Sequence, residues 1–178
     1  TVAVAGDSAG GNFAAVVARH PYVFVMFSSP ECPHCKKALP ELVKLAKKYD
    51  DEKKDGVIAI LDVHANAATA AKYGVTGFPS FRLFFHGIPI EYKHDRPEKH
   101  FAAWLNNRLK DRAEEITTLE AYKKVEGMKL AGLMYLGKKN KRVLTNFQAL
   151  AAHYVRVPFY YTYLDKVQEE LGVTGDVA

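Results

Sequence analysis

A pair of cysteines separated by two residues is the feature that most constrains this chain. Cys32 and Cys35 are its only cysteines, and an apolar run over residues 23–27, shortly before them, predicts a buried strand. We expect a helix to open at the cysteines, where the partial positive charge of a helix N-terminus favours a thiolate. Two thiols at this spacing can close into a disulfide and reopen, so the pair predicts redox chemistry.

Two structural roles compete with this interpretation. A disulfide that closes so short a loop would constrain the unfolded chain very little and would stabilise the fold poorly. A structural zinc site normally takes four ligands, and the chain has no second cysteine pair, although its seven histidines leave a mixed site open. Redox chemistry is therefore the leading interpretation of the cysteine pair. It needs no metal and no separate cofactor, because the cysteines themselves are the redox centre.

The first part of the chain alternates predicted strands and helices. A short apolar run at residues 2–5 comes first. The hydrophobic periodicity then predicts helices over 13–19, 36–49, 66–73 and 97–111, and strands over 22–27, 57–63, 80–85 and 88–92. This order describes a mixed sheet with helices on both sides. We therefore predict an α/β domain over residues 1–112.

The rest of the chain repeats this theme at half length. Helices are predicted over 119–125 and 146–154, strands over 130–136 and 158–163, and a last helix begins at Leu164. Residues 113–178 contain no cysteine, so this part cannot perform thiol chemistry. We predict an incomplete second α/β unit.

Composition excludes several other classes of protein. The chain is 48% hydrophobic and 25% charged, which is typical of a globular protein, and no stretch approaches the length needed to insert into a membrane. The net charge is +5, but its densest cluster, at residues 138–142, has no interleaved aromatic residues for stacking on bases, so we expect no nucleic-acid binding. The chain begins at Thr1 rather than at a methionine, which suggests a processed product.

Two segments carry a family resemblance. Residues 12–37, through the cysteines, and residues 73–80, Tyr-Gly-Val-Thr-Gly-Phe-Pro-Ser, resemble a catalytic domain of protein disulfide isomerase. The resemblance extends to Leu109. Residues 117–172 look similar to the redox-inactive second domain of these isomerases, cut short. The resemblance implies a thioredoxin-like mixed sheet flanked by helices, followed by an incomplete second thioredoxin-like unit.

The resemblance also implies roles for individual residues. Cys32 is the exposed nucleophile and Cys35 the resolving thiol, while Pro79 has a cis peptide bond and faces the pair. Arg96 is a mobile cation that helps Cys35 to ionise. The isomerases bury a glutamate in the strand before the motif and pair it with a lysine in the next central strand to relay protons. Met26 and Ile60 occupy these positions here, so efficient turnover is in question.

The residues around the cysteines depart from the isomerase pattern in a second way. The family usually has tryptophan before the first cysteine and glycine-histidine between the two, whereas this chain has Glu31 and Pro33-His34. Pro-His is the dipeptide of the bacterial periplasmic disulfide oxidase, whose first thiol is unusually acidic. We therefore expect Cys32 to be acidic, stabilised by His34 and the helix terminus, with Glu31 acting in the opposite direction.

A competing motif precedes the cysteines. Residues 6–11, Gly-Asp-Ser-Ala-Gly-Gly, match the G-x-S-x-G turn of α/β-hydrolases, which would make Ser8 a nucleophile. Such a turn needs several strands and an oxyanion loop upstream, but only five residues precede Gly6. We therefore do not expect esterase activity.

The combined reading is a thiol–disulfide oxidoreductase or protein disulfide isomerase that acts on unfolded or cysteine-containing proteins. The alternative is a non-catalytic binding or assembly subunit with the same fold. The resemblance places the chain in the endoplasmic reticulum lumen or another oxidising compartment. No retention signal ends the chain, so we expect it to be part of a longer protein or a larger assembly.

Overall fold

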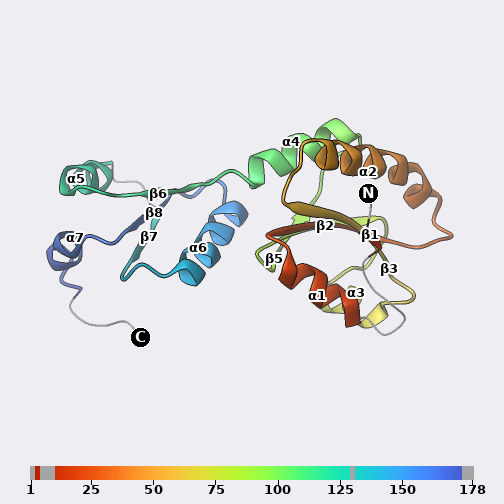
Figure 1. The fold of residues 1–178 in the computed structure, drawn as a ribbon, viewed down its shortest axis with the longest axis horizontal. Coiled ribbons are helices and arrows are strands. Elements are labelled where there is room, and N and C mark those ends of the chain that lie inside the picture. Colours follow the sequence, from red (N-terminus) through yellow and green to blue (C-terminus); the bar gives the residue numbers. More distant parts are fainter. Residues whose placement is uncertain (1–2, 5–10, 129–130, 174–178) are drawn as a thin grey trace. The chain divides into compact units, whose positions relative to one another are not determined.

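The structure is a computed structural model that describes residues 3–4, 11–128 and 131–173. The chain divides into two compact units, Thr1–Leu109 and Lys110–Ala178. Figure 1 shows both units, each with its own sheet and helices.

A five-stranded mixed sheet forms the centre of the first unit. Its strands are β1 (Ala3–Val4), β2 (Tyr22–Ser28), β3 (Gly56–Asp62), β4 (Ser80–Phe85) and β5 (Ile88–Tyr92), in the spatial order β1-β3-β2-β4-β5. Strands β1 and β2 run parallel to β3, whereas β4 is antiparallel to both β2 and β5. The mixed sheet predicted from the sequence is thus confirmed, and β2 lies at its centre with the cysteines just beyond its carboxyl end.

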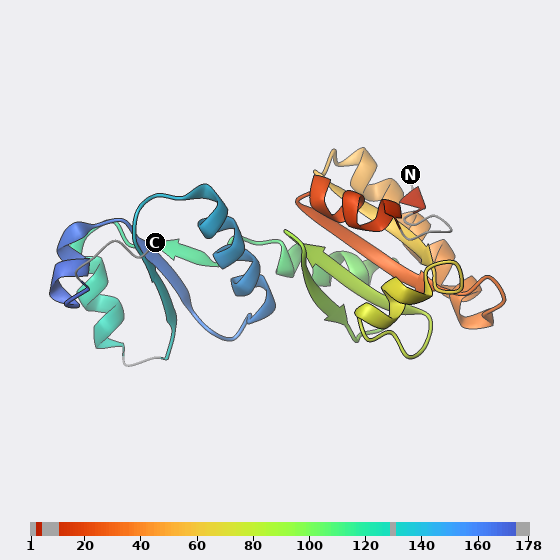
Figure 2. The same ribbon diagram turned by 90° about the horizontal axis from the view of Figure 1, so that it is seen from below.

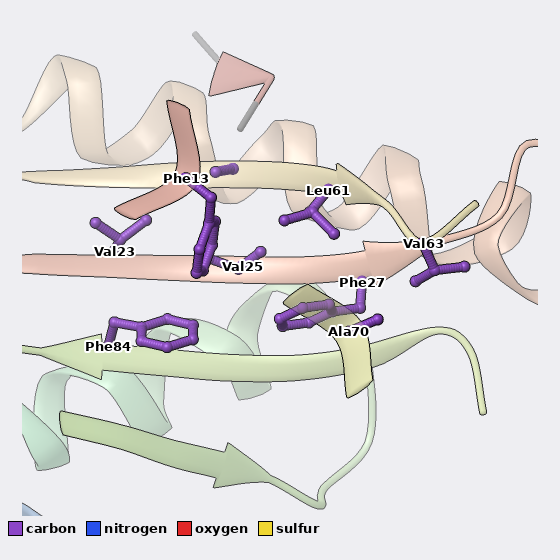
Figure 3. Close-up of a cluster of buried hydrophobic side chains, with 9 residues drawn as sticks. Phe13, Val23, Val25, Phe27, Leu61, Val63, Ala70 and Phe84 are labelled. Atoms are coloured by element: carbon purple, nitrogen blue, oxygen red, sulfur yellow. The ribbon is translucent and has the colours of Figure 1, made fainter. Parts of the chain in front are cut away.

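Helices cover both faces of this sheet. Helices α1 (Gly11–Arg19) and α3 (Ala67–Lys72) lie on one face, and α2 (Pro33–Asp51) and α4 (Glu98–Arg108) pack together on the other (Figures 1 and 2). Phe13 of α1 packs its ring 5.1 Å from that of Phe84 and 6.3 Å from that of Phe27 (Figure 3). On the opposite face, the ring of Phe24 lies 5.5 Å from that of Phe101 in α4. Alternate residues of β2 therefore face opposite layers, which is why the whole strand is apolar.

The hairpin between β4 and β5 turns where the sequence predicts. His86 and Gly87 both have positive φ, at 47° and 84°, as the tight turn of a hairpin requires at its two central positions. The His86 backbone N–H donates to the carbonyl of Pro21 at 2.8 Å, which holds the turn against the start of β2.

The second unit has a smaller sheet. Its strands are β6 (Ala113–Glu115), β7 (Leu133–Leu136) and β8 (Phe159–Thr162), all parallel in the order β6-β8-β7. Its helices are α5 (Leu119–Gly127), α6 (Lys141–His153) and α7 (Asp165–Glu170).

Three features of this unit differ from the prediction. β6 was not predicted, because two of its three residues are exposed glutamates without an apolar pattern. α6 begins at Lys141 instead of residue 146, because the Asn140 side chain accepts hydrogen bonds from the backbone N–H groups of Arg142 and Val143 and caps the helix. The strand predicted over 130–136 begins only at Leu133, and residue 130 lies outside the described residues.

Two further sequence expectations concern a membrane-spanning helix and the motif around Ser8. No helix among them combines the length and the apolar character that crossing a membrane requires. Ser8 and the rest of its motif lie outside the described residues, except for Gly11, where α1 begins.

Candidate active site

Cys32 caps the N-terminus of helix α2. Its backbone is extended, and Pro33 occupies the first helical turn, where the missing N–H of proline costs no hydrogen bond. The Cys32 N–H donates to the Ser29 carbonyl at 3.2 Å, and the Cys35 N–H donates to the Cys32 sulfur at 3.2 Å. The turn after β2 therefore aims the Cys32 sulfur at the positive end of α2.

The two cysteines are both free thiols, and their environments differ. The pKa of Cys32 is lowered, chiefly by a hydrogen bond from the Cys35 side chain and further by the backbone N–H groups of Cys35 and His34 and the charge of Arg96, against an opposing effect of burial. The pKa of Cys35 is raised, chiefly by burial and by its hydrogen bond to Cys32. Two groups oppose this rise, the backbone of Ser29 and the side chain of Ser28. One thiol is thus prepared to ionise and the other to stay protonated.

Exposure of the cysteines departs from what the resemblance implies. Cys32 is only 8% exposed and Cys35 2%. Cys32 is therefore the more accessible of the two sulfurs but is not an exposed side chain, because the capped turn and the segment before β4 surround it.

That segment contains Pro79. The Phe78–Pro79 peptide bond is cis, Pro79 is buried, and the Cys32 thiol donates to the Phe78 carbonyl at 3.7 Å. The Phe78 side chain is 44% exposed, whereas Phe81 and Phe84 in β4 are buried. The turn that brings the Phe78 carbonyl to the sulfur leaves its ring on the surface.

His34 and Arg96 lie on the same side of the cysteines. Both are exposed and line one groove, between α2 and the segment that follows β5. The charge of Arg96 acts on Cys32, whereas the resemblance implies an effect on Cys35. His34 lowers the pKa of Cys32 through its backbone N–H.

Sequence reasoning missed two residues next to the cysteines. The Ser29 hydroxyl and His64 Nε2 are 3.0 Å apart and share a hydrogen bond, and the His64 ring lies 6.1 Å from that of Phe78. Ser29 is 4% exposed, and its backbone carbonyl accepts a hydrogen bond from the Cys32 N–H. The order of the strands could have indicated this pair. β2 and β3 are adjacent parallel strands, so residues just after each strand meet at one edge of the sheet.

Met26 and Ile60 are partners in the register of β2 and β3. Met26 is 1% exposed and Ile60 is partly buried. The two positions that carry the proton-relay pair in the isomerases are thus adjacent here, and both are apolar.

Within the described residues, no group of three or more histidine, cysteine, aspartate or glutamate side chains is placed to hold a metal ion.

Comparisons with known proteins agree with this geometry. The sequence profile of the thioredoxin family matches residues 5–107. Protein disulfide isomerase-like 1-4 of rice is 30% identical over 114 residues, which cover 64% of this chain and 20% of the relative. The first thioredoxin domain of mouse protein disulfide-isomerase A4 is 29% identical, with a TM-score of 0.53 over 58% of this chain and 71% of that one.

A longer structural match includes the second unit. The zinc-bound form of human ERp44 superimposes with a TM-score of 0.74 at 18% identity, over 96% of this chain and 49% of that one. The chain spans only about a fifth of its rice relative and about half of the ERp44 chain. These matches confirm the fold class predicted from the sequence.

Proposed function

Because this chain belongs to the thioredoxin family, we propose that it is a thiol–disulfide oxidoreductase of the protein disulfide isomerase type, which exchanges disulfides with protein substrates through Cys32 and Cys35. The observation that carries the proposal is the opposite effect of the fold on the two thiols. Hydrogen bonds lower the pKa of Cys32, whereas burial raises the pKa of Cys35. Exchange proceeds by attack of a thiolate on a disulfide, so this difference makes Cys32 the nucleophile and leaves Cys35 to resolve the mixed disulfide.

The first step of the proposed reduction is attack by the Cys32 thiolate on one sulfur of a substrate disulfide. A bond forms between Cys32 and that sulfur, the substrate disulfide breaks, and the other substrate sulfur leaves as a thiolate that takes up a proton. The Phe78 carbonyl and the Cys35 N–H flank the reacting sulfur.

Resolution is the second step. Cys35 loses its proton and attacks Cys32, which closes the Cys32–Cys35 disulfide and releases the second substrate thiolate. The substrate disulfide is reduced to two thiols, and the two cysteines are oxidised. The same steps in reverse oxidise a substrate dithiol, and attack by the released thiolate on another bond rearranges disulfides.

A trapping experiment tests the proposal. In Cys35→Ser, the first step should proceed and the second should fail, so a mixed disulfide with a reducible protein such as insulin should accumulate. Cys32→Ser should form no adduct, and the unaltered chain should reduce insulin. Absence of turnover by the unaltered chain, together with absence of a trapped adduct, would contradict the proposal.

The rival function is a non-catalytic binding or assembly subunit. The observation that favours it is the apolar Met26–Ile60 pair, which removes one route for the Cys35 proton. The two functions differ in a scrambled-ribonuclease assay. The enzyme should restore ribonuclease activity in a manner that depends on Cys32, whereas a subunit would bind the substrate and leave its disulfides unchanged.

The proposal also covers the direction of electron flow and the cellular compartment of the reaction. We place the reaction on cysteine-containing or unfolded proteins in an oxidising lumen such as the endoplasmic reticulum. A reduction potential near about −120 mV for the Cys32–Cys35 pair would indicate an oxidase, and one near about −270 mV a reductase. The lowered pKa of Cys32 favours the oxidising end, because a stabilised thiolate makes reduction of the disulfide easier.

A further inference from the structure

A groove of about 390 Å³ lies beside the cysteines. One wall is a face of α2, and the other is the segment that joins β5 to α4. Its lining residues are His34, Lys37, Ala38, Glu41, Arg96 and Pro97. Four of these are at positions 34, 37, 38 and 41, the spacing that places residues on one face of a helix. The groove therefore starts at His34, two positions after Cys32, and follows one face of α2.

The groove carries positive charge that the protein does not neutralise. Lys37 and Arg96 are exposed, and among the residues that the structure describes no carboxylate forms an ion pair with either. Asp95 directly precedes Arg96 in the chain, but its carboxylate Oδ2 lies 3.9 Å from His100 Nδ1 instead.

Glu41 is the one acidic residue in the lining, and its carboxylate is already occupied. Its Oε1 accepts from Lys44 Nζ at 2.5 Å, and its Oε2 accepts from the Glu98 N–H at 2.8 Å. These two hydrogen bonds, the Lys44 one first, lower the pKa of Glu41, so it stays ionised and bound to its partners. The remaining charge of the groove is therefore positive.

The spacing between Cys32 and Lys37 matches a short stretch of extended polypeptide. Lys37 follows Cys32 by five positions, which is about 7.5 Å along a helix axis. An extended chain rises about 3.3 Å per residue, so that distance corresponds to about two or three residues. A substrate whose cysteine reacts with Cys32 would place a side chain two or three positions away beside Lys37 and Arg96.

We propose that this groove selects protein substrates that carry an acidic residue two or three positions from the reactive cysteine. The inference rests on the proposed function and names its substrate class. Lys37 is its specificity-determining residue. Arg96 contributes as well, but it also acts on Cys32, so Lys37 gives the cleaner test.

Lys36 and Lys37 provide a matched pair of variants. Both are exposed lysines one position apart, and substitution of either by glutamate changes the net charge equally, but only Lys37 lines the groove. The substrates are two peptides with the same internal disulfide. One has glutamate at the second and third positions from a cysteine, and the other has glutamine there. The readout is the ratio of kcat/KM for the acidic peptide to that for the amide peptide.

The unaltered chain should prefer the acidic peptide by about two- to fivefold, the range expected for an exposed ion pair. Added salt should narrow that preference. Lys37→Glu should abolish or invert it, and Lys36→Glu should keep most of it.

If Lys37→Glu and Lys36→Glu reduced the preference for the acidic peptide equally, the proposal would be overturned. The preference would then reflect the general charge of the protein and not the groove. Equal reaction of both peptides with the unaltered chain would also overturn it, while leaving the proposed function intact. Failure of both peptides to react, together with failure to reduce insulin, would remove the proposed function and this inference with it.

Discussion

The backbone N–H of Cys35 points at the sulfur of Cys32 from 3.2 Å away. This contact follows from the position of Cys32 as the cap of α2, where a side chain satisfies a helix N–H that has no partner within the helix. A sulfur in this place gains more from the contact as a thiolate than as a thiol. The reactivity of the site is therefore built largely from the main chain and from the second cysteine.

Removal of the Cys35 thiol should raise the pKa of Cys32. The Cys35 side chain is the largest of the effects that lower this pKa, and Cys35→Ala removes it while keeping the backbone N–H. Cys35→Ser, which keeps a donor, is the matched control and should raise the pKa less. The pH dependence of iodoacetamide alkylation reports on Cys32 alone in both variants. Identical profiles would show that the thiol donor does not matter.

Loss of the Arg96 charge should also raise the pKa of Cys32, by a smaller amount. Arg96 is exposed, so solvent and salt screen its effect, and the difference should shrink as salt is added. Lys99→Gln removes the same charge from a nearby exposed position of α4 and serves as the control for Arg96→Gln. Equal shifts of the alkylation profile in both variants would show that the Arg96 charge has no specific effect on the pKa of Cys32.

His86 should make the first unit less stable at acidic pH. Burial lowers its pKa from the ordinary value of 6.5, so the unfolded chain binds a proton more readily than the folded one. Above pH 6.5 the folded unit keeps its full stability. As the pH falls from 6.5 through the lowered pKa of His86, protonation of the unfolded chain reduces the free energy of unfolding. His86→Asn should reduce this loss, because asparagine tolerates the positive φ of 47° and does not titrate.

Urea unfolding can measure this effect. Trp104, the single tryptophan, packs against Tyr92 in the first unit, so its fluorescence reports on that unit. The difference in stability between the unaltered chain and His86→Asn at a pH well above 6.5 sets the baseline. That difference should shift in favour of the variant as the pH is lowered, and a constant difference would contradict the prediction.

Gly56→Ala should destabilise the first unit by about 1–3 kcal/mol. A methyl group at Gly56 would lie 2.0 Å from an atom of the Tyr22 ring, which is itself only 7% exposed. That ring stands edge-on to Tyr49, with centroids 6.3 Å apart, so it has little room to move. At Gly77 a methyl group would meet nothing within 4 Å, so Gly77→Ala should change stability by less than about 0.5 kcal/mol. Equal effects of the two substitutions in urea unfolding would contradict the packing argument.

Introducing a charged pair at Met26 and Ile60 should restore a proton route to Cys35. Met26→Glu alone should be strongly destabilising, because it buries an unpaired carboxylate at a position that is 1% exposed. Ile60→Lys, at the register partner, should recover part of that loss in a double-mutant cycle and speed the decay of the mixed disulfide. Additive stability changes with no faster decay would argue against a relay at these positions.

The strongly patterned elements were predictable from the sequence. The apolar run of β2, the helical period of α2 and the hairpin at His86-Gly87 all appear close to their predicted bounds. β6 and the start of α6 were missed for a shared reason. Pairing with β8 creates the first, and a cap by one asparagine side chain creates the second, so neither depends on an apolar period.

Interactions within the site were less predictable. The contact between Ser29 and His64 joins residues 35 positions apart, and hydrophobic periodicity carries no information about such a pair. The exposure of Phe78 likewise depends on the path of the chain through space, which its sequence neighbours do not reveal.

The sequence by itself determined the α/β class, the location of the redox pair and the helix that begins there, because these depend on local apolar periods and on residues close together in the chain. Only the tertiary structure decided how the two thiols differ. It buries Cys35 more deeply than Cys32, brings the Phe78 carbonyl to 3.7 Å from the Cys32 sulfur and sets Arg96 beside Lys37 in one groove. Burial and charge depend on distances through space, and those distances exist only once the strands have paired and the helices have packed on them.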